Sequence, residues 1–362
     1  MKYFSTAMIL ISMWMATPSF ATNYWVSATD GISGDCTSAI GATDPGIYLR
    51  SIADGLACVG PVGSELGAGH IVIVKDGVYN ETLLNQIPSG ASQDQQFTLM
   101  AQNVGGAVLQ PTTTAGSIIY IGIDTHYLTI SGLVLDGSNS LVNGLSFSSY
   151  GSAAFHDIRV TQVEVKNTDG NGMQFGNGTN FDVDHNWVHD GGACGQGAYL
   201  GYCHGMYMGA NFQNSVVDGN TIDHYQGYAI HFYDDFAGTI TGNVIRNNKA
   251  HHNGSNAKGE GSILIWGPNN QIYNNISYAN VGPGFNVAYG GNSIHDNVAW
   301  NNGDSGICDI SGGNTIVNNI LIENAGGAFT GDASSTASNN MTTGTAANYF
   351  FNAVAGDFTR IR

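Results

Sequence analysis

The feature that most constrains this chain is a repeated phrase in which an apolar residue is followed three positions later by asparagine. The phrase recurs as Val183–Asn186, Val217–Asn220, Ile240–Asn243, Ile272–Asn275, Ile294–Asn297 and Ile316–Asn319, with Ala337–Asn340 as a weaker copy. Successive asparagines are 34, 23, 32, 22, 22 and 21 residues apart. The basic unit is therefore about 22 residues long, and about ten residues are added in two places.

A second phrase, a small residue followed by alternating apolar positions, keeps step with the first. It occurs at Gly172–Phe175, Gly205–Met208, Ala229–Phe232, Ser262–Ile265 and Gly284–Val287. These starts are 33, 24, 33 and 22 residues apart, so the two long gaps recur. Short strands joined by Gly, Asn and Asp turns cannot bury their apolar side chains alone, but stacked units share one core. We predict an all-β fold, a right-handed single-stranded parallel β-helix (a solenoid), with the repeated asparagines stacked as an internal ladder.

The N-terminal segment indicates export. Lys2, the apolar run 7–15 and the small residues near Ala21 are typical of a secretory signal peptide over residues 1–21. The β-helix domain would then comprise residues 22–362, with an N-terminal cap over 22–68, coils over about 69–345 and a C-terminal cap over 346–362. Within the first cap we expect a helix that starts at Asp44–Pro45 and buries Leu49, Ile52, Ala53 and Leu56 against the first coil.

Charge and cysteine content restrict the compartment and the partners. The formal net charge is −17, which disfavours nucleic acid as a partner, and no segment after residue 21 is apolar enough to span a membrane. We expect a secreted protein, extracellular or periplasmic, that is monomeric. In such a compartment Cys36–Cys58 and Cys194–Cys203 are the expected disulfides, which leaves Cys308 unpaired.

Two stretches near the N-terminus resemble the start of many pectate-lyase-like β-helix proteins. They are Tyr24–Ser27 and, after the expected helix, Val72–Glu81. The Asn-ladder coils resemble the same superfamily, and the resemblance covers roughly residues 22–345. It implies the fold rather than one activity, because this fold carries lyases, hydrolases, epimerases and non-catalytic surface proteins. The arginine-centred motif of true pectate lyases is missing.

The two insertions point to the site. One lies at 191–203 and the other at roughly 251–261, each just before a strand of the second phrase, with one ordinary coil between them. Loops inserted at one corner of a solenoid commonly line its binding face. Strand alternation predicts that the outward row between them is polar and aromatic, which suits a polysaccharide. The candidate catalytic residues are His204, Tyr207, His231, Asp234 and Asp235, and the candidate substrate-binding residues are Gln174, Tyr233, Lys258, Glu260, Trp266 and Asn286.

Three functions remain open for this row. A lyase or epimerase acting on an acidic, uronate-containing glycan needs an acid/base group and a group that neutralises the carboxylate. His204 and Tyr207, with His231 one coil later, resemble the His/Tyr sites of alginate-type lyases and epimerases. The nearby cations in the sequence are Lys249, Lys258 and Arg246, and Ca²⁺ is an optional cofactor. A glycoside hydrolase would instead use paired carboxylates such as Asp234, Asp235 and Glu260. The third alternative is a non-catalytic glycan-binding or surface protein. We favour the first.

Overall fold

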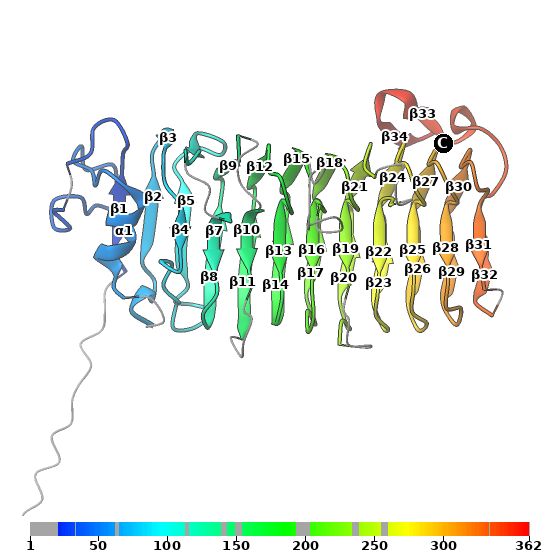
Figure 1. Ribbon diagram of the computed structural model, residues 1–362, viewed down its shortest axis with the longest axis horizontal. Coiled ribbons are helices and arrows are strands. Elements are labelled where there is room, and N and C mark those ends of the chain that lie inside the picture. Colours follow the sequence, from blue (N-terminus) through cyan, green and yellow to red (C-terminus); the bar gives the residue numbers. More distant parts are fainter. Residues whose placement is uncertain are drawn as a thin grey trace, which may run out of the picture.

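The chain forms a single long solenoid of parallel strands in a computed structural model (Figure 1). The structure describes residues 21–32, 34–61, 65–112, 116–138, 143–148, 154–192, 203–233, 239–254, 260–332 and 334–361. The expected signal peptide therefore lies almost entirely outside the described residues. No helix in the described part of the chain is long and apolar enough to cross a membrane.

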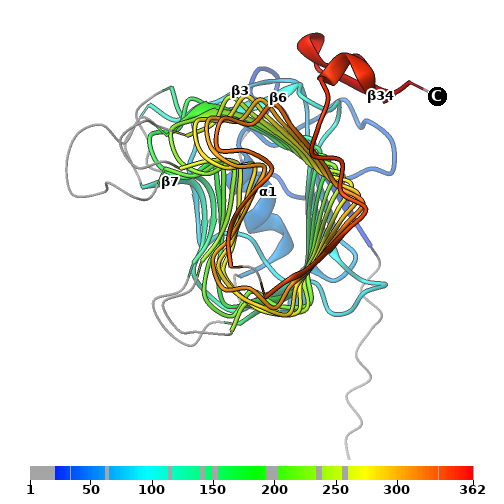
Figure 2. The ribbon, with the colours of Figure 1, turned by 90° about the vertical axis from the view of Figure 1, so that its right-hand side faces the viewer.

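Three parallel sheets form the walls of the solenoid, as the view along its axis shows (Figure 2). We name them sheets A, B and C, and the predicted right-handed parallel β-helix is confirmed. Sheet A contains β1 (Asn23–Val26), β2 (Ile71–Val74), β5 (Phe97–Ala101), β8 (Thr125–Ser131), β11 (Phe155–Thr161), β14 (Gly178–Asp184), β17 (Val216–Asp218), β20 (Val244–Arg246), β23 (Gln271–Tyr273), β26 (Ser293–His295), β29 (Thr315–Val317) and β32 (Thr336–Ser338).

Sheets B and C have ten strands each. Sheet B contains β4 (Leu83–Leu84), β7 (Ser117–Ile121), β10 (Asn143–Phe147), β13 (Met173–Phe175), β16 (Met206–Met208), β19 (Ile230–Phe232), β22 (Ile263–Ile265), β25 (Phe285–Val287), β28 (Ile307–Asp309) and β31 (Phe329–Gly331). Sheet C contains β3 (Gly77–Tyr79), β6 (Ala107–Leu109), β9 (Val134–Asp136), β12 (Glu164–Lys166), β15 (Trp187–Gly191), β18 (Thr221–Tyr225), β21 (Lys249–His251), β24 (Ile276–Tyr278), β27 (Val298–Trp300) and β30 (Ile320–Ile322).

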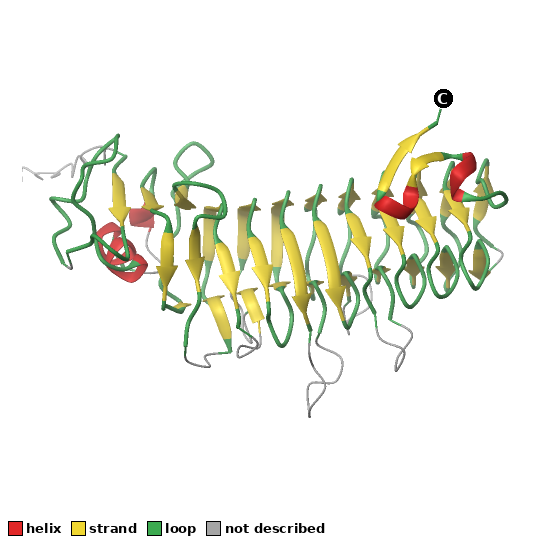
Figure 3. Ribbon diagram, turned by 90° about the horizontal axis from the view of Figure 1, so that it is seen from above, coloured by secondary structure: helices red, strands yellow, loops and turns green. Residues whose placement is uncertain are grey.

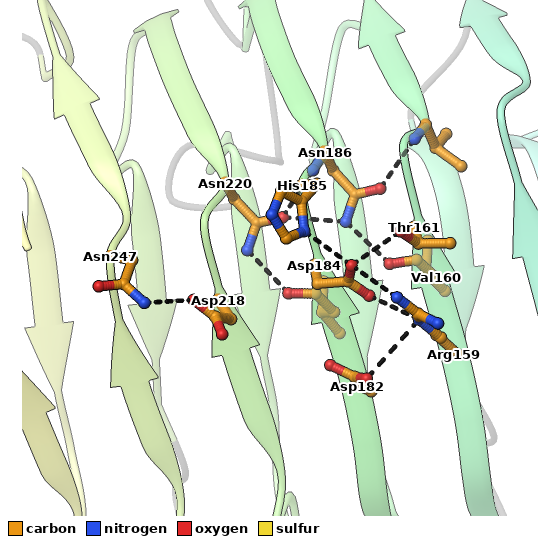
Figure 4. Close-up of polar contacts among 12 residues, drawn as sticks. Arg159, Val160, Thr161, Asp182, Asp184, His185, Asn186, Asp218, Asn220 and Asn247 are labelled. Atoms are coloured by element: carbon orange, nitrogen blue, oxygen red, sulfur yellow. Dashed lines mark hydrogen bonds and ion pairs between the residues drawn. The ribbon is translucent and has the colours of Figure 1, made fainter. Parts of the chain in front are cut away.

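Asparagine ladders satisfy the buried backbone at three corners rather than one. At the corner between sheets A and C the side-chain amide of each ladder residue donates to the side-chain oxygen of the next one. This ladder runs through Asn186, Asn220, Asn248, Asn275, Asn297, Asn319 and Asn340. Figure 4 shows its first two members, Asn186 and Asn220. Asn243 does not belong to this ladder. It stands at the corner between sheets B and A, in a second ladder with Asn270, Asn292 and Asn314. A third ladder, Asn253, Asn280, Asn302 and Asn324, follows sheet C.

The N-terminal helix is present but begins later than expected. Helix α1 spans Ile52–Val59, with Ser51 as the N-cap, and its Ile52 and Leu56 are buried. The expected start at Asp44 is wrong, because Asp44 instead accepts hydrogen bonds from the Gly46 N–H and the Tyr48 hydroxyl in a turn. The Glu81 carboxylate accepts from two backbone N–H groups in the first turn of α1, which fixes the start of the helix at Ser51.

The C-terminal segment lies outside the solenoid wall. A short 3-10 turn at Ala346–Asn348 precedes an antiparallel hairpin of β33 (Phe350–Asn352) and β34 (Asp357–Arg360), and a second one at Ala353–Ala355 connects the two strands. Its Ala346, Phe350 and Ala353 pack on outward side chains of sheet C, so the hairpin covers the side of the last coils and not their open end (Figures 2 and 3). A third 3-10 turn, Glu65–Gly67, follows α1.

Candidate functional site

One row of outward side chains on sheet B brings several predicted residues together. Met206 and Met208 of β16 are fully buried, so the residue between them, Tyr207, faces outward. Strand pairing places Gln174 on one side of Tyr207 and His231 on the other, one side chain per coil. The same register continues through Leu264, Asn286 and Cys308. We call these six residues the sheet B row.

The extra residues of the two long coils are distributed over the corners of the solenoid differently from the sequence prediction. Residues 192–205 connect β15 to β16 and residues 252–262 connect β21 to β22, so both connections lie between sheets C and B, on either side of the His231 coil. The second insertion, expected at roughly 251–261, is however divided between two corners of the solenoid: the one between sheets C and B and the one between sheets B and A. The connection from β19 to β20 runs over 233–243, whereas the equivalent one from β22 to β23 runs only over 266–270. The courses of 193–202, 234–238 and 255–259 lie outside the described residues.

His204 is held rigidly at the start of β16. Its ring is almost completely buried, and its Nδ1 accepts the backbone N–H of Tyr228 at 3.1 Å. A neutral His204 therefore carries its proton on Nε2. Glycine at position 227 makes room for the ring, because a Cβ there would lie 2.6 Å from the His204 Nδ1.

His231 stands at the centre of the cluster. Its ring centroid lies 3.9 Å from that of His204 and 5.3 Å from that of Tyr207. The side chain is buried at 8% exposure, and its Nδ1 has no hydrogen-bond partner. Burial, and secondly the neighbouring His204, holds the pKa of His231 well below its usual range. His231 is therefore neutral at pH 7, with a lone pair on one of its two ring nitrogens.

Tyr228 completes the cluster and was missed by sequence reasoning. Its ring stacks on His231 at 5.1 Å with an interplanar angle of 13°, and its hydroxyl accepts from the Asn286 Nδ2 at 3.2 Å. Burial raises the pKa of Tyr228, so this phenol stays protonated. The Asn286 Oδ1 is buried without a hydrogen-bond partner. Tyr228 lies at the turn before β19, where strand alternation gives no direction for a side chain.

Aromatic residues extend the site toward sheet A. Tyr233 lies 5.4 Å from His231, and Trp266 lies 5.0 Å from Tyr233 between ring centroids. On the other side, a hollow of about 170 Å³ is lined by Gln174, Tyr207 and the backbone of Gly176, among other residues. Larger hollows lie at the C-terminal hairpin and on sheet A.

The charged candidates are only partly placed. Asp234, Asp235 and Lys258 lie outside the described residues. Glu260 is described, and its charge contributes to the raised pKa of Tyr228, so it lies near the cluster. Cys203 is disulfide-bonded, but its expected partner Cys194 lies outside the described residues. The Cys36–Cys58 disulfide is confirmed, and Cys308 is a free thiol.

Two cations proposed for the site are elsewhere. Arg246 faces outward from sheet A, where it pairs with Asp218 at 2.8 Å. Lys249 faces outward from sheet C and donates to the Gly356 carbonyl of the C-terminal segment. Sheet A also holds the Arg159–Asp184 ion pair at 2.8 Å (Figure 4). The described residues of the sheet B row include no lysine or arginine.

Metal binding finds no support among the described residues. They contain no group of three or more His, Cys, Asp or Glu side chains arranged around a metal position. Hard cations such as Ca²⁺ need several oxygen ligands, and Glu260 is a described carboxylate whose charge acts on the cluster at Tyr228. We therefore derive no chemical step through Ca²⁺.

Comparison with known proteins supports the fold. The family model "Right handed beta helix region" matches residues 211–359. Pectate lyase Pel9A superposes with a TM-score of 0.63 and 16% identity over 92% of this chain and 84% of its own. ORF18 of Geobacillus virus E2 superposes with a TM-score of 0.63 and 15% identity over 88% of this chain, and the match covers 60% of the viral protein. The alginate lyase from Paenibacillus sp. str. FPU-7 superposes with a TM-score of 0.53 and 15% identity, over 80% of this chain and 97% of the lyase.

These matches show the fold. The chain forms a right-handed parallel β-helix, and the predicted resemblance to pectate-lyase-like β-helix proteins is confirmed at the level of the fold. Among curated protein sequences, none matches the chain significantly.

Proposed function

We propose that this protein is a carbohydrate-active enzyme that performs lyase or epimerase chemistry on a uronate-containing glycan at the sheet B row. The observation that carries the proposal is the buried, neutral His231, whose Nδ1 has no hydrogen-bond partner and whose ring centroid lies 5.3 Å from that of Tyr207. A neutral imidazole next to a phenol is a base paired with an acid, as proton transfer at carbon requires. The solved pectate lyase and alginate lyase of the same fold are consistent with this chemistry.

In the lyase reaction, His231 takes the proton from the carbon next to the substrate carboxylate. The electron pair left on that carbon forms a double bond to the adjacent carbon, whose bond to the glycosidic oxygen breaks. The Tyr207 hydroxyl donates a proton to the departing oxygen. The products are an unsaturated uronate and a new free hydroxyl, and Tyr207 regains a proton from solvent or from His231.

In the epimerase reaction no bond of the glycan backbone breaks. The carbon that loses its proton to one group receives a proton from a group on its opposite face. Gln174, in register with Tyr207, carries amide donors suited to the substrate carboxylate or to hydroxyls. The Nε2–H of a neutral His204 is a further donor beside His231.

Purified protein mixed with alginate or polygalacturonate tests both reactions. Elimination produces the ultraviolet absorbance of a conjugated double bond, and epimerisation in D₂O places deuterium on the carbon next to the carboxylate. We expect His231→Asn and Tyr207→Phe to lower either signal at least ~100-fold, as for loss of a general acid or base. Reducing ends that rise without unsaturation would favour hydrolysis, and binding without any product would favour a non-catalytic protein.

A matched control exists on another face. Tyr273 and His295 form an outward Tyr/His stack on consecutive coils of sheet A, with ring centroids 5.0 Å apart. His295→Asn removes the same chemical group as His231→Asn but lies outside the proposed site, so turnover should be unchanged. Equal losses in the two variants would contradict the assignment.

A further inference from the structure

Three aromatic side chains follow consecutive strands of sheet B, at the edge that leads to sheet A. Tyr233 comes after β19, Trp266 after β22 and Tyr289 shortly after β25. Ring centroids are 5.0 Å apart for Tyr233 and Trp266 and 6.3 Å apart for Trp266 and Tyr289. All three side chains are partly exposed, so each ring is available at the surface while it contacts the next.

We propose that Tyr233, Trp266 and Tyr289 form an aromatic ramp that binds successive sugar rings of a glycan lying along the solenoid axis. This proposal deepens the proposed function and rests on it for the identity of the ligand as a glycan. Pyranose rings present an apolar C–H face, which packs on Trp and Tyr while the ring edges keep their hydroxyls in water. Coils of a β-helix repeat every ~4.8 Å, close to the advance of an extended glycan per sugar, so one aromatic ring per coil can meet one sugar.

The position of the ramp sets the course of the glycan. Tyr233 lies nearly parallel to His231, with an interplanar angle of 20°, so the ramp begins at the proposed reacting position. The hollow at Gln174 and Tyr207 lies on the opposite side of His231 along the axis. A glycan would therefore occupy the hollow with one end, cross His231 and continue over Trp266 and Tyr289. Longer chains gain contacts that shorter ones cannot reach.

The ramp makes contact without ionic bonds. Neither the ramp nor the described residues of the sheet B row contribute a lysine or an arginine, so stacking and hydrogen bonds carry the binding. Affinity that rests on such contacts changes little with ionic strength, in contrast to attraction between charges. The ramp also accepts uncharged sugars, which separates this inference from the assignment of a uronate as the reacting residue.

Calorimetric titration in the His231→Asn background tests the ramp without turnover. The probes are the hexasaccharides and disaccharides of mannuronate, galacturonate and β-1,4-xylose. We expect Trp266→Ala to weaken binding of at least one hexasaccharide by up to about tenfold, the equivalent of ~1.4 kcal/mol. Disaccharide binding should change less, and added salt should leave the affinity for the uncharged xylose hexasaccharide nearly unchanged.

Trp187→Ala is the matched control. Trp187 is a 46% exposed tryptophan on sheet C, stacked on His189 with ring centroids 3.8 Å apart, on a different wall of the solenoid. Its loss should leave all affinities unchanged. The proposal is overturned if Trp266→Ala binds like its parent, if Trp187→Ala loses as much affinity, or if none of the hexasaccharides binds. Binding of the xylose hexasaccharide alone would sustain the ramp and reject the uronate assignment.

Discussion

Replacing one ladder asparagine with alanine tests how the solenoid is held together. Asn275 is fully buried, and its Nδ2 donates to the Ile245 carbonyl at 2.9 Å and to the Asn297 Oδ1 at 3.0 Å. Its Oδ1 accepts from the backbone N–H and from the side-chain amide of Asn248, both at 3.0 Å. Asn275→Ala removes all four hydrogen bonds in the middle of the ladder.

The expected cost follows from which groups lose every partner. The Asn248 side-chain amide keeps a bond to the Val217 carbonyl, and the Asn297 Oδ1 keeps the Asn275 backbone N–H. The Asn248 backbone N–H loses its recorded acceptor and stays buried, at about 1–3 kcal/mol. The other three bonds contribute about 0.5–1.5 kcal/mol each. We therefore expect the free energy of unfolding to fall by about 2.5–7.5 kcal/mol.

Urea unfolding followed by circular dichroism measures this loss. The control is Asn274→Gly at the preceding position, where the residue is exposed and has a φ of 54° that glycine adopts without strain. That variant should stay within about 0.5 kcal/mol of the parent. A loss below about 1 kcal/mol for Asn275→Ala would refute the reasoning, because water or repacking would then replace the ladder bonds.

Two further predictions concern acid stability and packing. Burial holds the pKa of His231 well below its usual range and lowers that of His251 to about 4, so below pH ~6.5 the unfolded chain takes up protons that the folded chain does not. Stability should fall as the pH drops from 6.5 toward 4. In urea titrations His231→Asn should reduce the slope of the free energy of unfolding against pH by up to ~1.4 kcal/mol per pH unit, and an unchanged slope would contradict this. At Gly205 a Cβ would lie 2.3 Å from the Ile222 Cγ2, whereas at Gly176 its nearest contact would be 3.8 Å away. Thermal unfolding should therefore show Gly205→Ala about 1–3 kcal/mol less stable and Gly176→Ala not destabilised, and equal effects would refute the packing argument.

The strand register could be predicted from the sequence because burial fixes it. Alternation in Gly205–Met208 and Ala229–Phe232 determines which side chains face the core, and a slip of one residue would expose all of them. The ladder was predicted less well. Asn243 and Asn248 each follow a left-handed residue, Gly242 and Asn247, so the two corners use the same local chemistry and the phrase alone cannot tell them apart. The ladder to which each asparagine belongs is instead determined by the asparagines of adjacent coils with which it forms hydrogen bonds.

The helix start shows the same limit. Asp44 is a good local capping residue, but Ser51 is chosen because the Glu81 carboxylate, far along the chain, accepts from the first turn of the helix. Tyr228 illustrates it at the candidate site. Its direction depends on the turn geometry before β19 and on Asn286, two coils away, neither of which a pattern of alternating residues encodes.

The pairing of the sheet B strands has a consequence for how such a protein changes its specificity. Tyr207 and His231 are in register at a sequence separation of 24 residues, and His231 and Leu264 are in register at a separation of 33. The number of residues that connect successive strands of sheet B therefore does not change the register of the sheet B row. We therefore expect that a chimera with corner segments taken from another β-helix would keep the sheet B row unchanged while the loops beside it differ.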